Sequence, residues 1–516
     1  MNKAFCDTCL TAVPAEPVER DGRIFLQKHC PKCGTKETYI SSDAARYFSK
    51  RKLDVEFDYR SCKAECQSCT HGQQLRFAFV NVTNRCNMNC PICFDNVPGL
   101  GFSFEPPLEY FDKLFADIAQ LNPSPTICIF GGEPTVREDL FDIIALTKKH
   151  GLRARVYTNG MKLADEEYCR KLLATRTQVY LSYDGSNPEM YEKLRGSAKF
   201  LELKQKGVDN MLKQGIKRGK LALVWVLSHG LNDQSIPELL EFCHERRETI
   251  TDVYLTTLCH AWDTTKWAFT PDRITTEDVE RLTEKAFPGY KINFLPLGLM
   301  TQLTALNEVI ARKTTRPSYG AHPNCESVYY ALSDGEKYVP IEHYLKGTTV
   351  DLAEGMLNLS ARVGARRERW KAGVLGRVLG AVRLRNFVQK VIAITATATF
   401  ITSRIRLFRL VEGRGPAKLW HLLMLGAKLA FRRPIRPALQ RHTRVKGHLM
   451  VAILPLEDTQ VLETNRLERC PTAQAYLDPK TQTARFVPLC AWKLHNKKVL
   501  REIADYYAES QVSKSG

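Results

Sequence analysis

From Arg76 onward the chain alternates short apolar runs with longer amphipathic ones, and this alternation restricts the fold more than any other feature. The short runs, rich in Val, Ile, Leu, Tyr and Phe, indicate strands, and the periodicity between them indicates helices. Six strand–helix units in succession predict parallel strands with right-handed crossovers, in an open sheet or a barrel. The predicted strands span 77–82, 126–130, 152–158, 177–183, 220–228 and 251–258, and the predicted helices span 106–120, 137–150, 165–175, 202–214 and 235–247.

A polar or glycine-rich motif follows each predicted strand. Because parallel strands carry their C-terminal ends at one face, motifs in these positions are expected to meet there, as catalytic residues do in barrel enzymes. The agreement of all the positions is stronger evidence for a functional face than any single motif. In chain order the motifs are the loop that contains Cys86, then Gly131-Gly132-Glu133-Pro134, Thr158-Asn159-Gly160, Ser182-Tyr183-Asp184-Gly185, Asn232-Asp233 and Cys259-His260.

Cysteine is unusually frequent, with 17 residues, and most of them lie near the N-terminus. The first residues lack the apolar run of a secretory signal, so metal ligation is expected rather than a disulfide framework. Cys6-x2-Cys9 and Cys30-x2-Cys33 bracket a strand-like stretch, Arg23–Gln27. Two such pairs bring four thiolates together tetrahedrally, which suits Zn²⁺ or a single rubredoxin-type iron. The spacing does not choose between the two metals.

Two runs of the form C-x3-C-x2-C come next. Three thiolates in one short loop suit a [4Fe–4S] cluster in which one iron lacks a cysteine from that run. The second run, TNRCNMNCPICF, together with GGE after the next strand, resembles the signature of the radical S-adenosylmethionine (SAM) enzymes. That resemblance implies that SAM chelates the open iron and is cleaved by one electron to methionine and a 5′-deoxyadenosyl radical. The two runs are Cys62, Cys66 and Cys69, and then Cys86, Cys90 and Cys93.

The same resemblance implies roles for the residues at the strand ends. Gly131 and Gly132 would let the backbone approach the methionine moiety of SAM, and Glu133 would accept a hydrogen bond from its ammonium group. A Ser or Asp that ends a strand can instead serve only as a helix cap. The other expected contacts are Ser182 and Asp184 near the ribose or the carboxylate, and Asn159 and Asn232 on the adenosine side.

A closer resemblance covers roughly residues 1–260 and 450–495. The phrases ERDGRIF, ISSDAARYF, VNVTNRCNMNCPICF, GGEPTVREDL, SYDG…YEKLRG and LERC…FVPLCAW are similar to the archaeal tetraether lipid synthase family, also described as hydroxymethylpterin methylase-like. This resemblance implies a rubredoxin-like iron, one or two auxiliary [4Fe–4S] clusters and a low-potential electron donor such as ferredoxin or flavodoxin. It also implies a lipid substrate whose tails are joined through their terminal carbons. The archaeal members carry a further Cys before the first barrel strand, where this chain has Arg76.

The second half of the chain contains a weak internal repeat. Cys325 precedes YYALSDGEKYVPIE, and Cys470 precedes AYLDPKTQTARFVPLC, a predicted hairpin with its turn at Asp478-Pro479. Glu342 stands where the second copy has Cys490. Cysteines before and after a hairpin would hold a metal cluster at its edge, so Cys325, Cys470 and Cys490 are expected ligands of a second auxiliary cluster. Cys259 is a candidate fourth ligand; otherwise it is a small buried residue, as expected for Cys128, Cys169 and Cys243.

The positive charge of the chain belongs to one segment. Lys and Arg number 75 against 56 Asp and Glu, a net charge of +19, and residues 361–446 hold 21 of the basic residues with only Glu368 and Glu412 as acids. Because Arg and Lys alternate there with apolar residues, we expect helices on an anionic membrane surface, with Trp370 and Trp420 at the headgroups. Solvated cationic helices are the plain alternative. No nucleic-acid partner is expected, because the segment has no aromatic stacking platform.

No run of 18 apolar residues is present, so we expect a cytoplasmic protein, peripheral to the membrane and without a transmembrane helix. These features favour a radical SAM enzyme that couples lipid hydrocarbon tails. Radical modification of a pterin or a peptide is the alternative, and a non-catalytic metal protein at the membrane is a third class. The expected α/β organisation is a rubredoxin- or zinc-ribbon-like domain at 1–56, an auxiliary cluster loop at 57–75, a partial (β/α)6 radical SAM barrel at 76–300, a basic amphipathic helical insertion at 301–447 and a C-terminal cysteine-bearing hairpin at 448–516.

Overall fold

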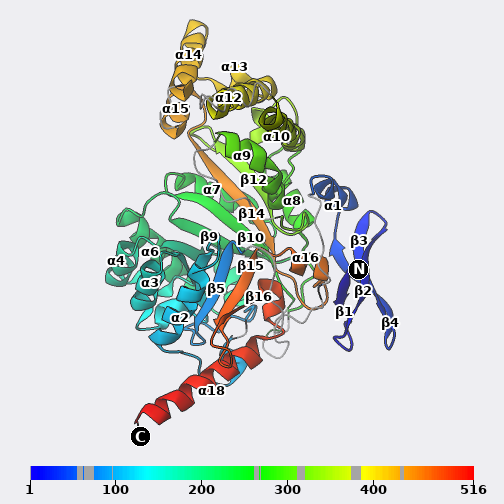
Figure 1. Ribbon diagram of the computed structural model, residues 1–516. Helices are drawn as coiled ribbons and strands as arrows, with labels where there is room; N and C mark the ends of the chain where they lie inside the picture. Colours follow the sequence, from blue (N-terminus) through cyan, green and yellow to red (C-terminus); the bar gives the residue numbers. More distant parts are fainter. Residues whose placement is uncertain are drawn as a thin grey trace.

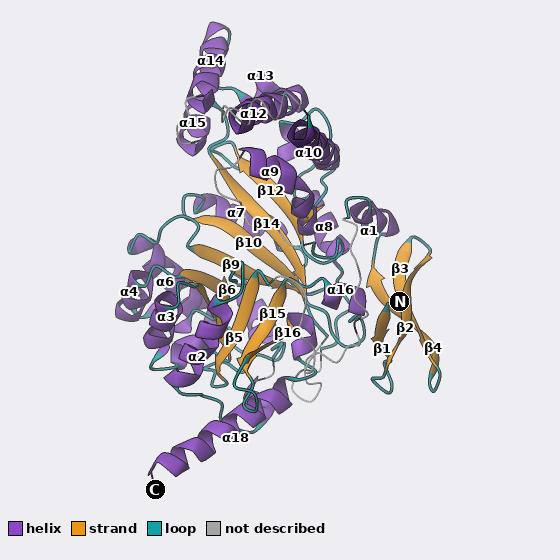
Figure 2. Ribbon diagram, in the orientation of Figure 1, coloured by secondary structure: helices purple, strands orange, loops and turns teal. Residues whose placement is uncertain are grey.

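Two β-sheets organise the chain in this computed structural model, a small one at the N-terminus and a large mixed one in the centre (Figures 1 and 2). Helices cover the large sheet, and a group of further helices projects from one of its edges. The structure describes residues 2–54, 62, 75–95, 97–260, 267, 269–310, 320–373, 385–430 and 435–515.

The N-terminal sheet is an antiparallel meander of four strands, of which the sequence had indicated only part of the third. An Asp21-Gly22 turn joins the second and third strands, and both of its residues have positive φ, as a two-residue hairpin of this kind requires. Helix α1 (Ala44–Arg51) follows, and the Asp43 side chain caps it by accepting a hydrogen bond from the Arg46 N–H. The strands are β1 (Lys3–Phe5), β2 (Ala12–Arg20), β3 (Arg23–Cys30) and β4 (Gly34–Ser41).

Six parallel strands with intervening helices form the partial barrel, which confirms the predicted fold. Each strand begins and ends within about a residue of its predicted bounds. The structure adds helix α5, which the prediction lacked although Asn187 caps its first turn and Gly196 ends it in the left-handed conformation. The strands are β5 (Phe77–Thr83), β6 (Thr126–Gly131), β7 (Arg153–Thr158), β8 (Gln178–Ser182), β9 (Leu221–Leu227) and β10 (Ile250–Thr257); the helices are α2 (Leu108–Ala119), α3 (Leu140–Lys149), α4 (Glu166–Ala174), α5 (Pro188–Arg195), α6 (Lys199–Lys213) and α7 (Ile236–Glu245).

Strands from the second half of the chain extend this sheet at both edges. β14 (Gly447–Pro455) pairs in parallel with β10, and β12 (Ser327–Ser333) pairs antiparallel with β14. At the other edge β15 (Thr472–Leu477) pairs in parallel with β5. The two copies of the internal repeat are therefore both hairpins, one on each edge: β12 with β13 (Tyr338–Pro340), and β15 with β16 (Ala484–Pro488).

The barrel interior is lined by aromatic rings from successive strands. Phe79, Phe130, Tyr157, Tyr180 and Tyr254 contact one another in turn, with ring centroids 4.7–6.0 Å apart. Rings at these separations add to the hydrophobic gain of their burial. The interior of the barrel is therefore a packed aromatic wall.

The described residues of the basic segment are mostly helical, as predicted. Its helices, together with α9, form a lobe beside β12 and β14 (Figure 1). Among the described residues, none of the helices is both long and apolar enough to cross a bilayer. The remaining elements are α8 (Thr276–Lys285), β11 (Leu295–Pro296), α9 (Thr304–Ile310), α10 (Thr349–Ala372), α12 (Arg385–Arg404), α13 (Leu407–Leu410), α14 (Pro416–Ala430), α15 (Ile435–His442), α16 (Thr464–Glu468), α17 (Leu489–Trp492), α18 (Asn496–Ser515) and the 3-10 turns η1 (Val97–Leu100), η2 (Pro134–Val136), η3 (Met161–Ala164), η4 (Leu297–Leu303) and η5 (Ile341–His343).

A buried ion cluster fastens the N-terminal domain to the barrel domain. Lys50 of α1 is 3% exposed, and its Nζ lies 2.6 Å from Glu277 Oε1 and 2.9 Å from Glu280 Oε1 of α8. Burial raises the pKa of Glu280, while the Lys50 ammonium opposes that rise. Lys50, with Arg46, therefore favours the charged state of Glu280.

Lys50→Ala should destabilise the protein by about 3–5 kcal/mol, because it removes the nearest cation from two buried carboxylates. Urea unfolding of the full chain measures the change. The matched control is Lys171→Ala on α4, whose partner Glu167 is 65% exposed, and which should cost under about 1 kcal/mol. Equal effects of the two substitutions would show that the cluster does not join the domains.

Candidate active site and metal centres

A cavity of about 280 Å³ opens at the C-terminal ends of the barrel strands. The cysteine loop after β5 and the Gly131–Glu133 turn line one part of it. Apolar and aromatic side chains line the rest: Phe79, Met88, Ile92, Phe94, Phe130, Tyr157, Tyr180, Val224, Val226, Tyr254, Leu454, Leu456 and Leu489. The motifs after β5, β6, β7 and β8 thus meet at this cavity, whereas Asn232-Asp233 and Cys259-His260 do not line it. Most of the lining is hydrocarbon.

Cys86, Cys90 and Cys93 all line this cavity and are half-buried. Burial, with smaller contributions from the charges of Glu133, Cys90 and Cys93, raises the pKa of Cys86 to about 12. A cationic iron cluster stabilises thiolates, so it would hold these cysteines in their anionic form. The residues therefore fit the cluster that the sequence implies.

Gly131 and Gly132 bring two backbone segments into close contact. A Cβ at Gly131 would lie 2.4 Å from the Thr83 carbonyl oxygen, and one at Gly132 would lie 2.2 Å from that of Arg85. The Gly132 N–H donates to Thr83 O and the Glu133 N–H to Arg85 O, both at 2.8 Å. The glycines line the cavity. Glycine is required at both positions, however, because their backbone contacts the backbone of Thr83 and Arg85, which lead into the cysteine loop.

Glu133 is fully buried and joins the loops after β6 and β7. It accepts hydrogen bonds from Thr135 N–H (3.0 Å), Thr135 Oγ1 (2.6 Å), Thr158 Oγ1 (2.7 Å) and Asn159 N–H (2.6 Å). Burial raises its pKa, and these donors oppose the rise. Asn159 in turn donates to Asn87 Oδ1 of the cysteine loop at 2.7 Å. The Glu133 carboxylate thus joins the loops after β6 and β7, and Asn159 extends this hydrogen-bond network to the cysteine loop after β5.

Ser182 lines the cavity, whereas Asp184 and Asn232 border a separate cavity of about 210 Å³. Arg195 Nε and Nη2 donate to the two oxygens of Asp184 at 2.7 and 2.8 Å. Burial opposes ionisation of Asp184, but Arg195 overcomes this and lowers its pKa. The side chain of Asn232 closes the turn after β9 by bonding to Ser228 N–H and Val226 O.

Arg195 and Lys204 are site residues that the sequence did not single out. Arg195 itself lines the cavity, so Asp184 acts on the site through it. Lys204 is fully buried and donates to the Ser182 carbonyl at 2.6 Å. Burial, with the nearby Arg195 charge, lowers the Lys204 pKa to about 8. The YEKLRG phrase contains Arg195 and was the sequence feature that could have identified it as a site residue. No sequence feature distinguishes Lys204 from its neighbours on the helix.

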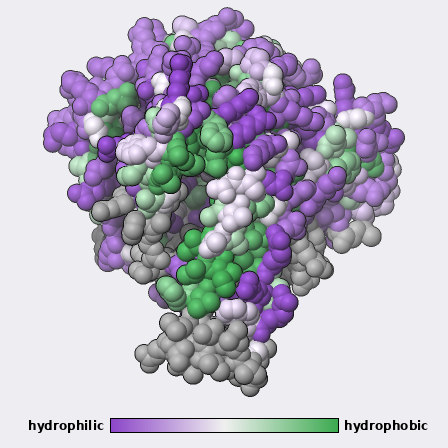
Figure 3. Space-filling view, turned by 90° about the horizontal axis from the view of Figure 1, so that it is seen from above, coloured by the Kyte–Doolittle hydropathy of each residue, from purple (hydrophilic) through white to green (hydrophobic). Residues whose placement is uncertain are grey.

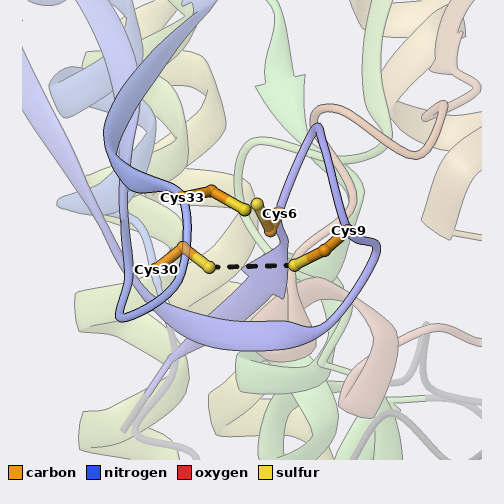
Figure 4. Close-up of side chains that lie close together, drawn as sticks. All are labelled: Cys6, Cys9, Cys30 and Cys33. Carbon is orange, nitrogen blue, oxygen red and sulfur yellow. Dashed lines mark hydrogen bonds between the residues drawn. The ribbon is translucent and has the colours of Figure 1, made fainter.

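Four cysteines of the N-terminal sheet converge, as their spacing predicts (Figure 4). The sulfur atoms of Cys6, Cys9, Cys30 and Cys33 all lie within 4.8 Å of one another. They come from the turns between β1 and β2 and between β3 and β4. Four converging thiols fit one tetrahedral metal ion, and this ligand set suits Zn²⁺ and iron equally.

Cys325, Cys470 and Cys490 gather where the two edge hairpins meet. Burial raises the pKa of Cys325 to about 11, and the pKa of Cys490 is raised by burial and by the charges of Glu457, Cys470 and Cys325. Arg76, the departure from the family pattern, pairs with Glu326 at 2.8 Å, beside Cys325. The three thiols thus fit a second cluster, which stays a prediction.

The other predicted metal residues have different surroundings. Cys62 is half-buried, and Cys66 and Cys69 lie outside the described residues, so an auxiliary cluster at this run also stays a prediction. Cys259 is buried near Asp458, Lys493 and Glu457. Glu342 bonds to Tyr329 and Thr349. Cys128, Cys169 and Cys243 are fully buried, in agreement with their expected role as small core residues.

Comparison with known proteins identifies the class. Residues 80–243 match the radical SAM superfamily model, and the chain is a radical SAM enzyme. Residues 2–42 match the HMPTM N-terminal zinc ribbon domain, so the N-terminal sheet is a zinc ribbon of that type.

Individual relatives share parts of the chain. The 7,8-dihydro-6-hydroxymethylpterin dimethyltransferase of Methanocaldococcus jannaschii is 29% identical over 66% of this chain and 70% of its own length. The Fe-coproporphyrin III synthase of Methanosarcina barkeri is 32% identical over 32% of this chain and 40% of its own length. The solved FeFe-hydrogenase maturase HydG from Carboxydothermus hydrogenoformans aligns over 50% of this chain and 61% of that chain, with 15% identity and a TM-score of 0.35, too distant to carry an argument.

Glu133→Ala should weaken SAM binding about 10- to 150-fold, because a charge-assisted hydrogen bond is worth roughly 1.5–3 kcal/mol. Calorimetric titration of the anaerobically reconstituted protein with SAM measures the affinity. Glu166→Ala, an exposed carboxylate on α4, is the matched control and should leave SAM affinity unchanged. Unaltered affinity in Glu133→Ala would remove Glu133 from the cofactor site.

Proposed function

We propose that this radical SAM enzyme joins lipid hydrocarbon tails through unactivated carbons. The observation that carries the proposal is the composition of the cavity that Cys86, Cys90 and Cys93 line, which is mostly aromatic and aliphatic. Burying each CH₂ group in such a wall contributes about 0.8 kcal/mol and needs no polar partner. A saturated chain is therefore the substrate class that this wall suits best.

The chemistry that such a substrate requires explains the polar side of the cavity. A saturated carbon offers no acidic proton and no leaving group, so general acids, bases and nucleophiles cannot act on it. A [4Fe–4S] cluster on Cys86, Cys90 and Cys93 with bound SAM would supply a hydrogen-abstracting radical. The chain's own residues position the cofactor: Glu133 fixes the loops around it, and the apolar wall excludes water.

An auxiliary cluster at Cys325, Cys470 and Cys490 belongs to the same proposal. These half-buried cysteines come from the ends of two hairpins, and Cys470 and Cys325 both act electrostatically on Cys490. Lys493 lies near both Cys93 of the radical loop and Cys259. Coupling two tails needs two hydrogen abstractions, and a cluster held by these three cysteines would supply a second redox-active group for them.

A second candidate function is radical methylation of a pterin. It is favoured by the name of the Methanocaldococcus jannaschii relative and by the ribbon type at residues 2–42. A pterin ring is planar and polar, so its recognition would depend on the few polar groups of the cavity, among them Asn89, Asp95 and Thr256. The two candidate functions therefore depend on different cavity residues: a lipid tail would contact the apolar lining, and a pterin would contact the polar groups.

Mass spectrometry of lipids and pterins from one expression host decides between the candidates. A host that lacks membrane-spanning lipids should gain lipids of doubled tail length when it expresses the unmodified chain, and none with the Cys86→Ala variant. Cys86→Ala should also abolish 5′-deoxyadenosine formation in the purified protein, because the cluster loses a ligand. Unchanged lipids together with a methylated pterin would replace the first proposal by the second.

Metal analysis tests the cluster count separately. Anaerobically purified protein should contain at least two [4Fe–4S] clusters and one tetrahedral metal. Cys470→Ser should lower the iron and sulfide content by about one cluster, while Cys243→Ser, a buried cysteine of α7 remote from the expected ligands, should leave it unchanged. A single cluster in the unmodified protein would show that the hairpin cysteines are structural thiols.

A further inference from the structure

Large apolar side chains are exposed on one group of helices. The described residues include 16 large hydrophobic side chains that are exposed, and half of them lie between 387 and 423, in α12, α13 and α14. Phe408 is 76% exposed and Phe387 is 65% exposed. We call this set the lobe face; its members are Phe387, Val391, Ile394, Ile401, Phe408, Leu419, Trp420 and Leu423.

The lobe face is not an incidental scatter of residues. Positions 387, 391, 394 and 401 recur at helical spacing and form one stripe along α12. The opposite side of the helix is already packed: Ala393 is 1% exposed, and the Phe400 ring stands over Gly355 of α10. Seen from above, Figure 3 shows a band of hydrophobic side chains bordered by hydrophilic ones. Within the described part of the chain, the stripe has no partner.

Basic side chains near the lobe face have few acids beside them. Arg404, Arg406, Arg409 and Arg414 are exposed between α12 and α14, and none of them forms a salt bridge with a described carboxylate, although Arg404 acts on Asp351 from a greater distance. Of the two acids in 361–446, Glu412 pairs with Lys446 at 3.2 Å. The lobe face thus combines an exposed apolar stripe with arginines that have no salt-bridge partner among the described residues. This combination complements a surface with anionic groups on the outside and hydrocarbon beneath them.

The composition of the face distinguishes a bilayer from a nucleic acid. Single-stranded nucleic acids stack their bases on aromatic rings, and aliphatic side chains contribute nothing to such stacking. Five of the eight members are Val, Ile or Leu, which gain by burial among acyl chains. Trp420 is 51% exposed at the margin, where an indole suits the headgroup boundary; Trp370 is half-buried beneath Arg366.

We propose that the lobe face docks on an anionic lipid bilayer, with the apolar stripe in the interface and the arginines against the headgroups. The helices lie on the bilayer, since none described is suited to span it. The proposal does not depend on the substrate of the barrel, because it rests on residues remote from the cavity.

Vesicle sedimentation of the full chain tests this docking. The chain should bind vesicles of phosphatidylcholine with about one third phosphatidylglycerol, and binding should fall steeply with salt. Neutralising Arg404, Arg406, Arg409 and Arg414 to Gln should weaken binding about 100-fold or more, since each basic group near the surface contributes roughly a fivefold factor. Phe387→Ser with Phe408→Ser and Leu423→Ser should weaken binding without changing the net charge.

The matched control neutralises Lys149, Lys171, Lys193 and Lys213 to Gln on α3, α4, α5 and α6, which removes the same charge from exposed positions elsewhere. It should lose far less affinity than the arginine variant. Equal losses of vesicle affinity in the two variants would overturn the proposal, because the net positive charge of the whole chain would then explain the binding. Tighter binding to single-stranded RNA than to vesicles, weakened by the Phe387, Phe408 and Leu423 substitutions, would overturn it in favour of a nucleic-acid surface. Neither result bears on the lipid and pterin measurements, so the two proposals fail separately.

Discussion

The close contact between the Gly131-Gly132 turn and the backbone of Thr83 and Arg85 is the constraint on which the rest of the site depends. Two short N–H···O bonds join these segments at a separation that no side chain permits. The cysteine loop is thereby held to the end of β6, and Glu133, the next residue, is directed into the interior. There it collects donors from the loop after β7. The geometry of the cavity near the cysteines thus depends on the absence of a Cβ atom at Gly131 and Gly132.

The sequence was sufficient to predict the parallel strands, because each is a short run rich in β-branched and aromatic residues between clear turn signals. The four N-terminal cysteines were equally predictable, since their spacing alone determines that they converge. The strands of the C-terminal hairpin were predictable too, but the pairing of the edge strands with the barrel was not: β14 pairs with β10, and β15 with β5, across separations of about 200 and 400 residues. No local periodicity encodes such pairings. The same holds for Arg195 and Lys204, whose importance arises from what lies beside them after folding.

The repeated hairpins show how a partial barrel can be completed by unequal copies of one motif. Each hairpin adds to one edge of the sheet, and Arg76 before β5 pairs with Glu326 before β12, so the two edges are joined by an ion pair. One copy ends with Cys490 and the other with Glu342, which bonds to Tyr329 within its own hairpin. The copies therefore differ at their far ends, where one has a thiol and the other a hydrogen-bonded carboxylate.

The position of β14 has a consequence for how a substrate reaches the cavity. Its first residue, Gly447, follows the helical lobe, and Leu454 near its other end lines the cavity. Nine extended residues span about 30 Å, since a strand rises roughly 3.3 Å per residue. The lobe is thus joined to the cavity by a full strand length. If the lobe docks on a bilayer as proposed, a lipid tail would have to leave that bilayer completely and travel about this distance before any chemistry could begin.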